Sequence, residues 1–242
     1  MKNRWCLQIF VCLAVSLGLA GTSAIPREIS ERYRSVPANA DGIGKSYMGR
    51  QIAHVMGWQG AGWLEREERE REERSDLLLR ILSLAPGMSV ADVGAGTGYY
   101  SRRIADAIGP NGKVYAIDVQ PEMFAMLQSV AKQRGYGHIT PLLGATNDVK
   151  LPAGSVDVAI MVDVYHELEF PYEVLASIVR AVKPGGRVVF VEYRAEDPRV
   201  PIKRLHKMSE AQIRREAEVH SLVWERTASD LPWQHVVIFK RR

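Results

Sequence analysis

The sequence predicts an α/β protein built on one mostly parallel β-sheet whose last strand is antiparallel. From residue 88 onward, short apolar runs alternate with helical stretches, a pattern typical of βαβ units in a sheet that helices cover on both faces. The last two strand-like runs, 222–227 and 235–240, lie too close together for a parallel crossover, which needs about a dozen residues or more. They must therefore form a hairpin. With 46% hydrophobic and 25% charged residues among 242, the chain can bury a sizeable core, and it is not disordered, collagenous or a multi-span membrane protein.

The first segment, residues 1–24, is predicted to be a cleaved signal peptide. Lys2 and Arg4 precede the apolar run 5–20, and the small residues that follow it offer a cleavage site after Ala24. This pattern predicts a secreted or periplasmic protein. The alternative is a protein anchored in the membrane by residues 5–20, but that run is shorter than the about 20 residues that a membrane-spanning helix needs.

The cysteine content and the net charge limit the chemistry of the mature chain. Both cysteines, Cys6 and Cys12, lie inside the apolar run. Removal of the signal peptide would leave residues 25–242 without a cysteine, which excludes a thiol nucleophile, a disulfide framework and a cysteine-ligated zinc. The formal net charge of the full chain, +4, is too small to indicate a nucleic-acid partner. We expect no stable membrane span in the mature form, and the oligomeric state is not indicated.

Residues 25–85 are expected to form an N-terminal extension before the main domain, residues 86–242. The stretch 25–64 shows no sustained period and is predicted as loop and short helix. The run 64–85 is predicted as one helix with an apolar second half that docks on the core. Its first half contains glutamate–arginine pairs spaced four residues apart, at Glu65–Arg69, Glu67–Arg71 and Glu70–Arg74. A solvent-exposed face is favoured there over a partner-binding patch.

The main domain is predicted to contain five parallel strands and the terminal hairpin. The parallel strands are expected at 88–93, 113–118, 139–143, 156–163 and 186–193. The helices are expected at 98–108, 121–134, 171–182 and near 209–219. Because open α/β sheets bind ligands at the carboxyl ends of their strands, the loops that follow the strands are the places to search for a site.

A glycine-rich turn joins the first of these strands to a helix. Gly94, Gly96 and Gly98 would let the backbone approach a ligand, and the helix N-terminus presents free N–H groups. The dinucleotide fingerprint G-x-G-x-x-G would need its third glycine at the position of Tyr99. Asp92, two residues before the first glycine, would repel a pyrophosphate but suits a ligand that carries an ammonium or sulfonium group.

Asp118 ends the next strand of the predicted sheet. A carboxylate about twenty residues after a glycine turn is the usual acceptor for both hydroxyls of a ribose. The alternative is that Asp118 caps the helix that begins near Pro121. The glycine turn and Asp118 together indicate a ligand that contains a ribose.

Four stretches in register resemble the class I, Rossmann-like S-adenosylmethionine-dependent methyltransferases. They are V-A-D-V-G-A-G-T-G-Y-Y-S (90–101), Y-A-I-D-V-Q-P-E-M (115–123), S-V-D-V-A-I-M-V-D-V-Y-H-E-L (155–168) and V-K-P-G-G-R-V-V-F-V-E-Y (182–193). The resemblance covers about residues 86–242, including the terminal hairpin. It implies a three-layer Rossmann-like methyltransferase sheet, S-adenosyl-L-methionine as the cofactor and a small-molecule substrate. Related enzymes carry a lid where this chain has its N-terminal extension, which makes residues 25–85 a possible lid.

The resemblance also implies which residues bind the cofactor. Gly94, Gly96 and Gly98 would line its methionine part, and Asp92 would lie near its amino group. Asp118 would hold the ribose.

The adenine end of the implied site rests on a stretch that matches the family less closely, and the acceptor end lies at the end of the fourth strand. The stretch 144–152 departs from the commoner family pattern, so either Asn147 or Asp148 would bind the adenine amino group. Asp163, at the end of the fourth strand, would lie where the floor of the pocket meets the substrate.

Methyl transfer is an in-line displacement for which the protein supplies alignment, a closed site and sometimes a base, so no metal is required. His166 is the candidate base for a hydroxyl acceptor, with Glu167 to orient it. The alternative is that both residues cap the next helix and shape the pocket. Phe170 stands where H-E-x-x-H would need its second histidine, which excludes a zinc peptidase.

The sequence therefore predicts an exported S-adenosylmethionine-dependent methyltransferase that acts on a small molecule. One alternative is a cofactor-binding protein of the same fold without catalytic activity, because the supply of S-adenosylmethionine outside the cytosol is unexplained. The other is an NAD-dependent oxidoreductase, which Tyr99 and the terminal hairpin oppose.

Overall fold

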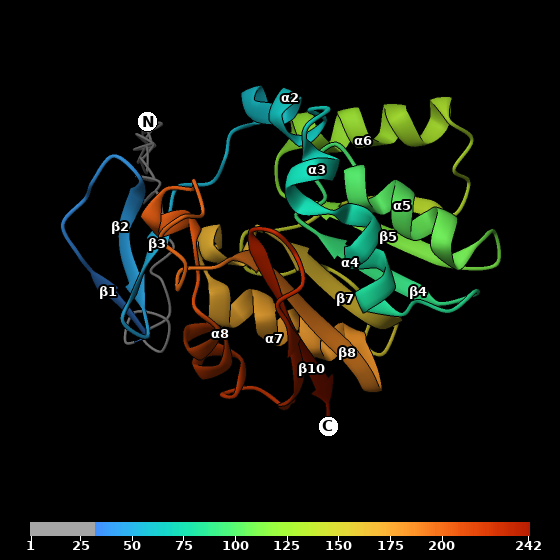
Figure 1. Ribbon diagram of the computed structural model, residues 1–242. Coiled ribbons are helices and arrows are strands. Elements are labelled where there is room, and N and C mark those ends of the chain that lie inside the picture. Colours follow the sequence, from blue (N-terminus) through green and yellow to red (C-terminus); the bar gives the residue numbers. More distant parts are fainter. Residues whose placement is uncertain (1–31) are drawn as a thin grey trace, which may run out of the picture.

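A seven-stranded sheet forms the centre of the computed structural model, which describes residues 32–242 (Figure 1). The predicted signal peptide, Cys6 and Cys12 lie outside the described residues. The strand order is β6-β5-β4-β7-β8-β10-β9. The strands are β4 (Ser89–Val93), β5 (Lys113–Asp118), β6 (Ile139–Leu143), β7 (Val156–Val162), β8 (Val182–Tyr193), β9 (Leu222–Ala228) and β10 (Gln234–Arg241).

The directions of the strands confirm the predicted topology. Strands β4 to β8 run parallel to one another, and β10 lies antiparallel between β8 and β9. The terminal hairpin is therefore confirmed, with its last strand inserted into the sheet. Strand β8 begins at Val182, earlier than predicted, because the Pro184–Gly186 stretch belongs to it.

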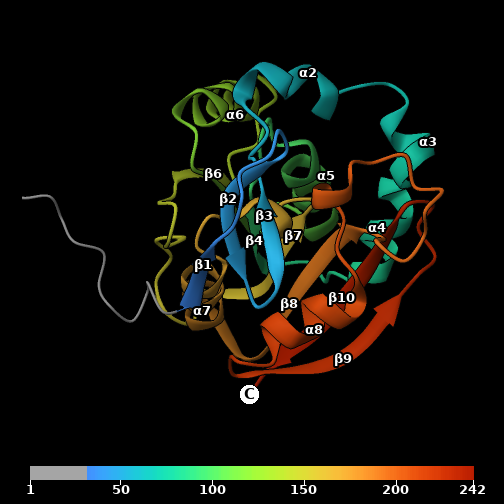
Figure 2. The same ribbon diagram turned by 90° about the vertical axis from the view of Figure 1, so that its left-hand side faces the viewer.

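Helices cover both faces of this sheet and make the fold three-layered (Figure 2). Helices α4 (Ser75–Leu82), α5 (Tyr99–Ile108) and α6 (Pro121–Gln133) pack on one face, and α7 (Pro171–Ala181) and α8 (Glu210–Ala217) on the other. Along β7, Val158 and Ile160 join the first core, whereas Ala159 and Met161 join the second. Burial on both faces explains why this strand reads as a nearly continuous apolar run.

The N-terminal extension contains a small antiparallel sheet that the sequence did not predict. Its strands are β1 (Tyr33–Ser35), β2 (Gly42–Tyr47) and β3 (Arg50–Ala53). Met48 and Gly49, at the turn between β2 and β3, both have positive φ, as the tight turns of β-hairpins require. Arg50 joins this sheet to the main domain: it pairs with Glu216 of α8 at 2.8 Å and donates to the backbone oxygen of His166 at 2.9 Å.

The predicted helix over residues 64–85 is wrong in its continuity. Its expected exposure holds for Glu67, Glu68 and Arg71 but not for Arg69 and Glu73, which are buried. The chain forms three short helices instead, α2 (Ala61–Leu64), α3 (Arg69–Glu73) and α4, with a break at Arg74, whose φ is 52°. None of the three predicted pairs forms an ion pair. Other pairs replace them: Glu65 pairs with Arg102 of α5, whereas Arg69 pairs with Glu73 and Arg74 with Asp76 inside the segment.

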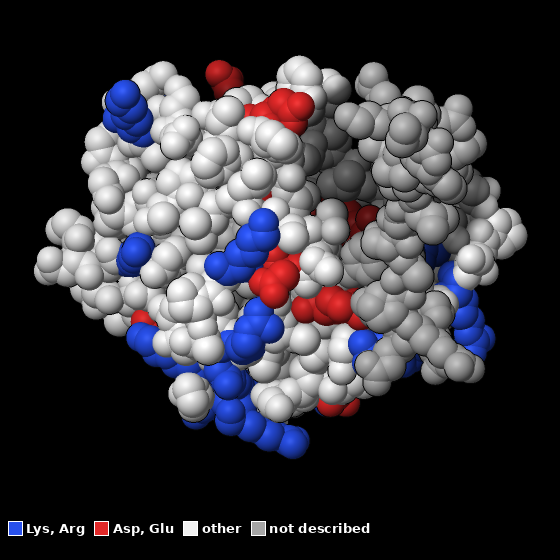
Figure 3. Space-filling view, turned by 180° about the vertical axis from the view of Figure 1, so that it is seen from behind, with Lys and Arg blue, Asp and Glu red and all other residues white. Residues whose placement is uncertain are grey.

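The surface carries mixed charge, in keeping with the weakly basic composition. Figure 3 shows Lys and Arg gathered along the lower part of the face behind that of Figure 1, with Asp and Glu among them. Exposed basic residues also form ion pairs, as Arg180 does with Asp148. Within residues 32–242, no helix combines the length and the apolar character needed to cross a membrane.

Candidate active site

A cavity of about 900 Å³ lies at the carboxyl edge of the parallel strands. This volume falls within the range of about 300–1,000 Å³ that is typical of small-molecule sites. The predicted site residues that line it are Asp92, Gly94, Gly96, Asp118, Asp163, His166 and Glu167. Gly98, Asn147 and Asp148 do not line it.

The glycine turn gives the cavity its room at the end of β4. Gly94, Gly96 and Gly98 have φ of 75°, 55° and 84°, a left-handed conformation that strains any residue with a side chain. A Cβ atom on Gly96 would lie 2.5 Å from Leu64 Cδ1, whereas one on Gly98 would lie 2.4 Å from Leu127 Cδ1. Leu127 belongs to α6, so Gly98 serves helix packing, and Gly94 and Gly96 serve the cavity.

Asp118 is locked to the glycine turn by a backbone hydrogen bond. Its Oδ2 accepts from the N–H of Gly96 at 2.9 Å, and its Oδ1 accepts from the N–H of Gln120 at 2.9 Å. Burial raises the pKa of Asp118, and these backbone donors oppose that rise. Each carboxylate oxygen keeps acceptor capacity beyond its single backbone bond, so Asp118 can receive further hydroxyl groups.

Two buried carboxylates face the cavity from neighbouring strands. Asp92 accepts from the hydroxyl of Ser101 at 2.6 Å, and burial raises the pKa of Asp92 to about 6. Asp163 follows β7; its Oδ2 accepts from Gln234 Nε2 at 3.1 Å, and its buried Oδ1 finds no hydrogen-bond partner within residues 32–242. Burial raises the pKa of Asp163 well above its usual value, and the nearby Glu73 adds to that rise. A cationic group of a ligand would complete this pair of acids.

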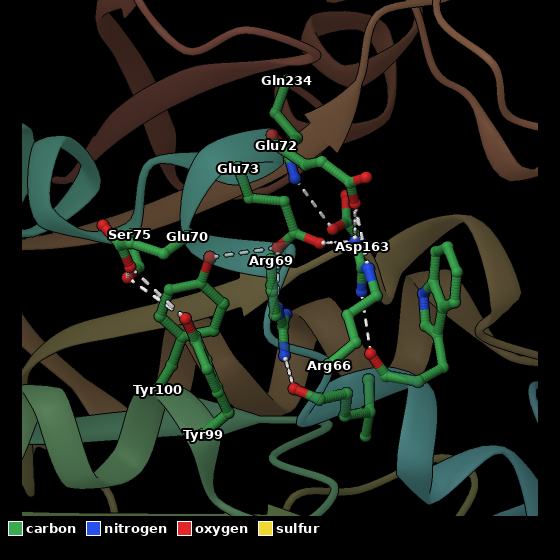
Figure 4. Close-up of polar contacts among 12 residues, drawn as sticks. Arg66, Arg69, Glu70, Glu72, Glu73, Ser75, Tyr99, Tyr100, Asp163 and Gln234 are labelled. Carbon is green, nitrogen blue, oxygen red and sulfur yellow. Dashed lines mark hydrogen bonds and ion pairs between the residues drawn. The ribbon is translucent and has the colours of Figure 1, made fainter.

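A buried arginine lies beside these acids, in the segment expected to be exposed (Figure 4). Arg69 is 5% exposed and lines the cavity. Its guanidinium donates to Glu73 at 2.8 Å and to the backbone oxygen of Leu64 at 2.8 Å, and it lies 4.2 Å from the ring centre of Tyr99. Tyr100 donates a further hydrogen bond to Glu73. The sequence did not predict Arg69 as a site residue, because the tyrosines that it contacts belong to α5, about 30 residues further along the chain.

Residues 54–65 cover the glycine turn, beside α6 in both ribbon views (Figures 1 and 2). The Gln120 side chain binds this segment on both sides, accepting from Trp58 N at 2.8 Å and donating to Met56 O at 3.0 Å. Glu65 accepts from the hydroxyl of Thr97, in the glycine turn, at 2.6 Å. The segment therefore closes the cavity over the end of β4.

The loop after β6 contributes different residues from those predicted. Asp148 is partly exposed and pairs with Arg180 at 2.9 Å, away from the cavity, and Asn147 does not reach the cavity either. Ala145 and Thr146 line the cavity from this loop. The structure therefore brings neither of the two adenine candidates to the site.

His166 is buried at the far side of the cavity and is held by a residue that the sequence did not indicate. Its Nδ1 lies 2.6 Å from Glu192 Oε2 of β8, and Glu192 also accepts from the N–H of Tyr165 at 2.8 Å. The orienting carboxylate is thus Glu192 rather than the predicted Glu167, whose Oε1 lies 3.6 Å from His166 Nε2. Burial alone would lower the pKa of His166, but the charge of Glu192 outweighs it and raises that pKa. Burial raises the pKa of Glu167 to about 7.

Sequence comparison shows which proteins the central part of the chain is similar to. Residues 91–190 match the family described as "Methyltransferase domain". A demethylmenaquinone methyltransferase of Anoxybacillus flavithermus is 29% identical over 119 residues, which cover 49% of this chain and 50% of the relative. A nocamycin O-methyltransferase of Saccharothrix syringae is 32% identical over 114 residues, which cover 46% and 40%. The chain spans about half the length of the curated relatives that it matches.

Structural comparison extends the similarity beyond the matched segment. A SAM-dependent methyltransferase from Aquifex aeolicus has a TM-score of 0.73 and 25% identity, with 78% of this chain and all of that chain covered. The [4+2]-cyclase SpnF, at a TM-score of 0.60 and 15% identity, shares the fold. These comparisons indicate the same fold as the order of the strands and the glycine turn bound to Asp118. The chain thus carries a methyltransferase domain over residues 91–190 and has the fold of the class I, Rossmann-like S-adenosylmethionine-dependent methyltransferases, whose cofactor is S-adenosyl-L-methionine.

Proposed function

We propose that this protein transfers a methyl group from S-adenosylmethionine to a small, largely apolar acceptor. The observation that carries the proposal is the hydrogen bond from Gly96 N–H to Asp118. It holds the carboxylate proposed to bind the ribose hydroxyls against the glycine turn, and both residues line the cavity. The bound cofactor supplies an activated methyl group on a sulfonium centre. The protein binds it, orients it and excludes water.

The polar groups of the cofactor's ribose and methionine parts find residues of matching chemistry in this wall. Asp118 accepts the two ribose hydroxyls. Asp92 and the unpartnered Oδ1 of Asp163 receive the ammonium group, and the buried guanidinium of Arg69 lies beside them for the carboxylate. These four side chains thus present three acceptors and one cation, the complement of a zwitterionic amino acid joined to a ribose.

The acceptor end of the cavity is proposed to be the side lined by His166 and Glu167. Ile43, Val55 and Ile202 also line the cavity, so the cavity suits an apolar ring or chain with a polar reacting atom. The relatives named for demethylmenaquinone and nocamycin fit such an acceptor. His166 as the base that takes the acceptor's proton stays a prediction of the sequence.

A fold alone does not fix the reaction, because one fold can carry different chemistry. The alternative is a cofactor-binding protein that does not transfer a methyl group. The structural neighbour named as a [4+2]-cyclase is an example of this fold in a protein named for a different reaction. An NAD-dependent oxidoreductase is not favoured, because Asp92 lies next to the glycine turn where a pyrophosphate would bind.

Binding measurements on a matched pair of variants test the proposal. Calorimetry should show that S-adenosylhomocysteine binds the purified protein and that Asp118→Ala weakens this binding by about 1–3 kcal/mol, the cost of losing a buried hydrogen-bond partner. Asp148→Ala, which removes a carboxylate outside the cavity, is the control and should bind as the unaltered protein does. Tighter binding of NAD than of S-adenosylhomocysteine would refute the assignment. Mass spectrometry of small molecules that co-purify with the protein, followed by a methyl-transfer assay on them, separates an enzyme from a binding protein.

Export of the protein, with cleavage after Ala24, is also part of this proposal. Its support is the sequence pattern of residues 1–24, which lie outside the described residues.

A further inference from the structure

Two histidines and a glutamate meet at the acceptor side of the cavity. His166 and Glu167 lie in the short turn that follows β7, and His206 lies in a second turn between β8 and α8. One ligand atom from each, an imidazole nitrogen or a carboxylate oxygen, lies within 4.8 Å of the other two. The rings of His166 and His206 are 5.2 Å apart, centre to centre. All three residues line the cavity, and we call them the His–Glu–His cluster.

In His166 and Glu167, the polar atom that points away from the cluster is hydrogen-bonded, and the polar atom that points toward the cluster has no hydrogen bond within residues 32–242. His166 Nδ1 is bound to Glu192, so its Nε2 is the atom that faces the cluster. Glu167 Oε2 accepts from the N–H of Met56 at 2.6 Å, so its Oε1 is the atom that lies 3.6 Å from His166 Nε2. A carboxylate on the far nitrogen of a histidine is the usual outer partner of a metal-binding imidazole, because it fixes the ring and its tautomer.

We propose that the His–Glu–His cluster binds one divalent transition-metal ion, with its remaining coordination positions open to the cavity. Zinc lies about 2.0–2.2 Å from nitrogen and oxygen ligands, so two ligand atoms of one ion lie at most about 4 Å apart. The 3.6 Å between His166 and Glu167 already meets this limit, and movements below about 1 Å bring in the third ligand. The sequence predicted no metal because methyl transfer requires none, and nothing in the sequence places His206 beside His166.

Three protein ligands with open positions are typical of catalytic rather than structural metal sites. Two histidines and one carboxylate suit zinc or ferrous iron better than calcium or magnesium, which prefer oxygen ligands. An acceptor oxygen bound to the ion would lose its proton more readily. His166 then acts as a ligand through Nε2 and not as a base.

Zinc titration of the metal-stripped protein tests this site without any assay of methyl transfer. Calorimetry should give one zinc ion per chain. His206→Ala should weaken the binding by at least about 100-fold, and Glu192→Gln, which removes only the outer partner, by about 10–100-fold. The control is His138→Gln, a histidine outside the cavity whose ring contacts the backbone oxygen of Ala105, and it should leave the affinity unchanged.

Two further measurements make the outcome decisive. Cobalt in place of zinc should give a visible absorption band that Glu167→Gln abolishes, with circular dichroism to show that each variant is folded. S-adenosylhomocysteine binding is measured in the same samples, so loss of the metal site and failure of the proposed cofactor site are seen separately. Unchanged zinc affinity in both folded variants, His206→Ala and Glu167→Gln, would overturn the metal site.

Discussion

The sequence predicted the residues that line the cavity where these residues belong to short motifs. Asp92, Gly96 and Asp118 belong to two short motifs with fixed spacing, so their place in the site follows from strand order alone. Arg69 and Glu192 were missed for the opposite reason. Each contacts a residue from a distant part of the chain: Arg69 lies against Tyr99 of α5, and Glu192 binds His166. The spacing of residues along the sequence does not predict such contacts.

We expect Gly96→Val to abolish binding of S-adenosylhomocysteine while the fold persists. Its added side chain would meet Leu64 and occupy the space above the turn, and its φ of 55° strains any residue with a Cβ atom. Gly135→Val is the matched control, since Gly135 has a φ of 73° but open space around its Cβ position. If calorimetry gives both variants the affinity of the unaltered protein, the glycine turn does not contact the cofactor.

The raised pKa of Asp92 predicts a pH-dependent stability in the absence of ligand. Burial moves this pKa from 3.8 to about 6, so the folded state keeps a proton that the unfolded state releases. The resulting stability is fully present below about pH 4 and is lost as the pH rises through about 6. Urea denaturation should therefore show a larger fall in the free energy of unfolding over this range for the unaltered protein than for Asp92→Asn. Parallel curves for the two proteins would contradict the prediction.

At the scale of elements, the main domain followed from the sequence and the N-terminal extension did not. Strands β5 and β6 have the predicted bounds. In β5, most of whose residues are buried, the apolar run ends where the chain leaves the sheet, whereas β6 is a largely half-buried edge strand. The pairs four residues apart in 65–74 predicted one helix, but Glu65 pairs with Arg102 of α5 instead and the chain breaks at Arg74, so tertiary contact overrode part of that local preference. The small sheet β1–β3 was missed because its strands mix glycine and polar residues without alternation.

Replacement of the buried acid of α3 should destabilise the protein strongly. Glu73→Gln leaves the buried guanidinium of Arg69 without its counter-charge, which costs about 3–5 kcal/mol in comparable buried pairs. Relief of the repulsion between Glu73 and Asp163 offsets part of this loss. Denaturant unfolding measures the difference, and Asp76→Asn, in an exposed ion pair, should leave the free energy of unfolding nearly unchanged. Equal effects of both substitutions would mean that the buried pair of Glu73 with Arg69 contributes no more stability than the exposed pair of Asp76.

At the scale of the whole molecule, the location of the protein can be tested directly. The signal-peptide pattern predicts that the natural protein begins at Ile25 and is recovered outside the cytoplasm. N-terminal sequencing of the protein from an extracytoplasmic fraction measures both properties. A protein that begins at Met1 and fractionates with soluble cytoplasmic markers would disprove export.

The insertion of β10 between β8 and β9 sets an order for the assembly of the cavity during synthesis. Gln234, the first residue of β10, is the hydrogen-bond donor that holds Asp163, so a carboxylate from the middle of the chain is oriented by a strand made near its end. A ribosome that has produced the glycine turn, Asp118 and His166 has not yet produced a finished cavity. The nascent chain therefore passes through a long interval in which the edge of β8 is unpaired, and β9 has no neighbour until β10 arrives. The orientation of Asp163 and the completion of the sheet are in this way a single late event.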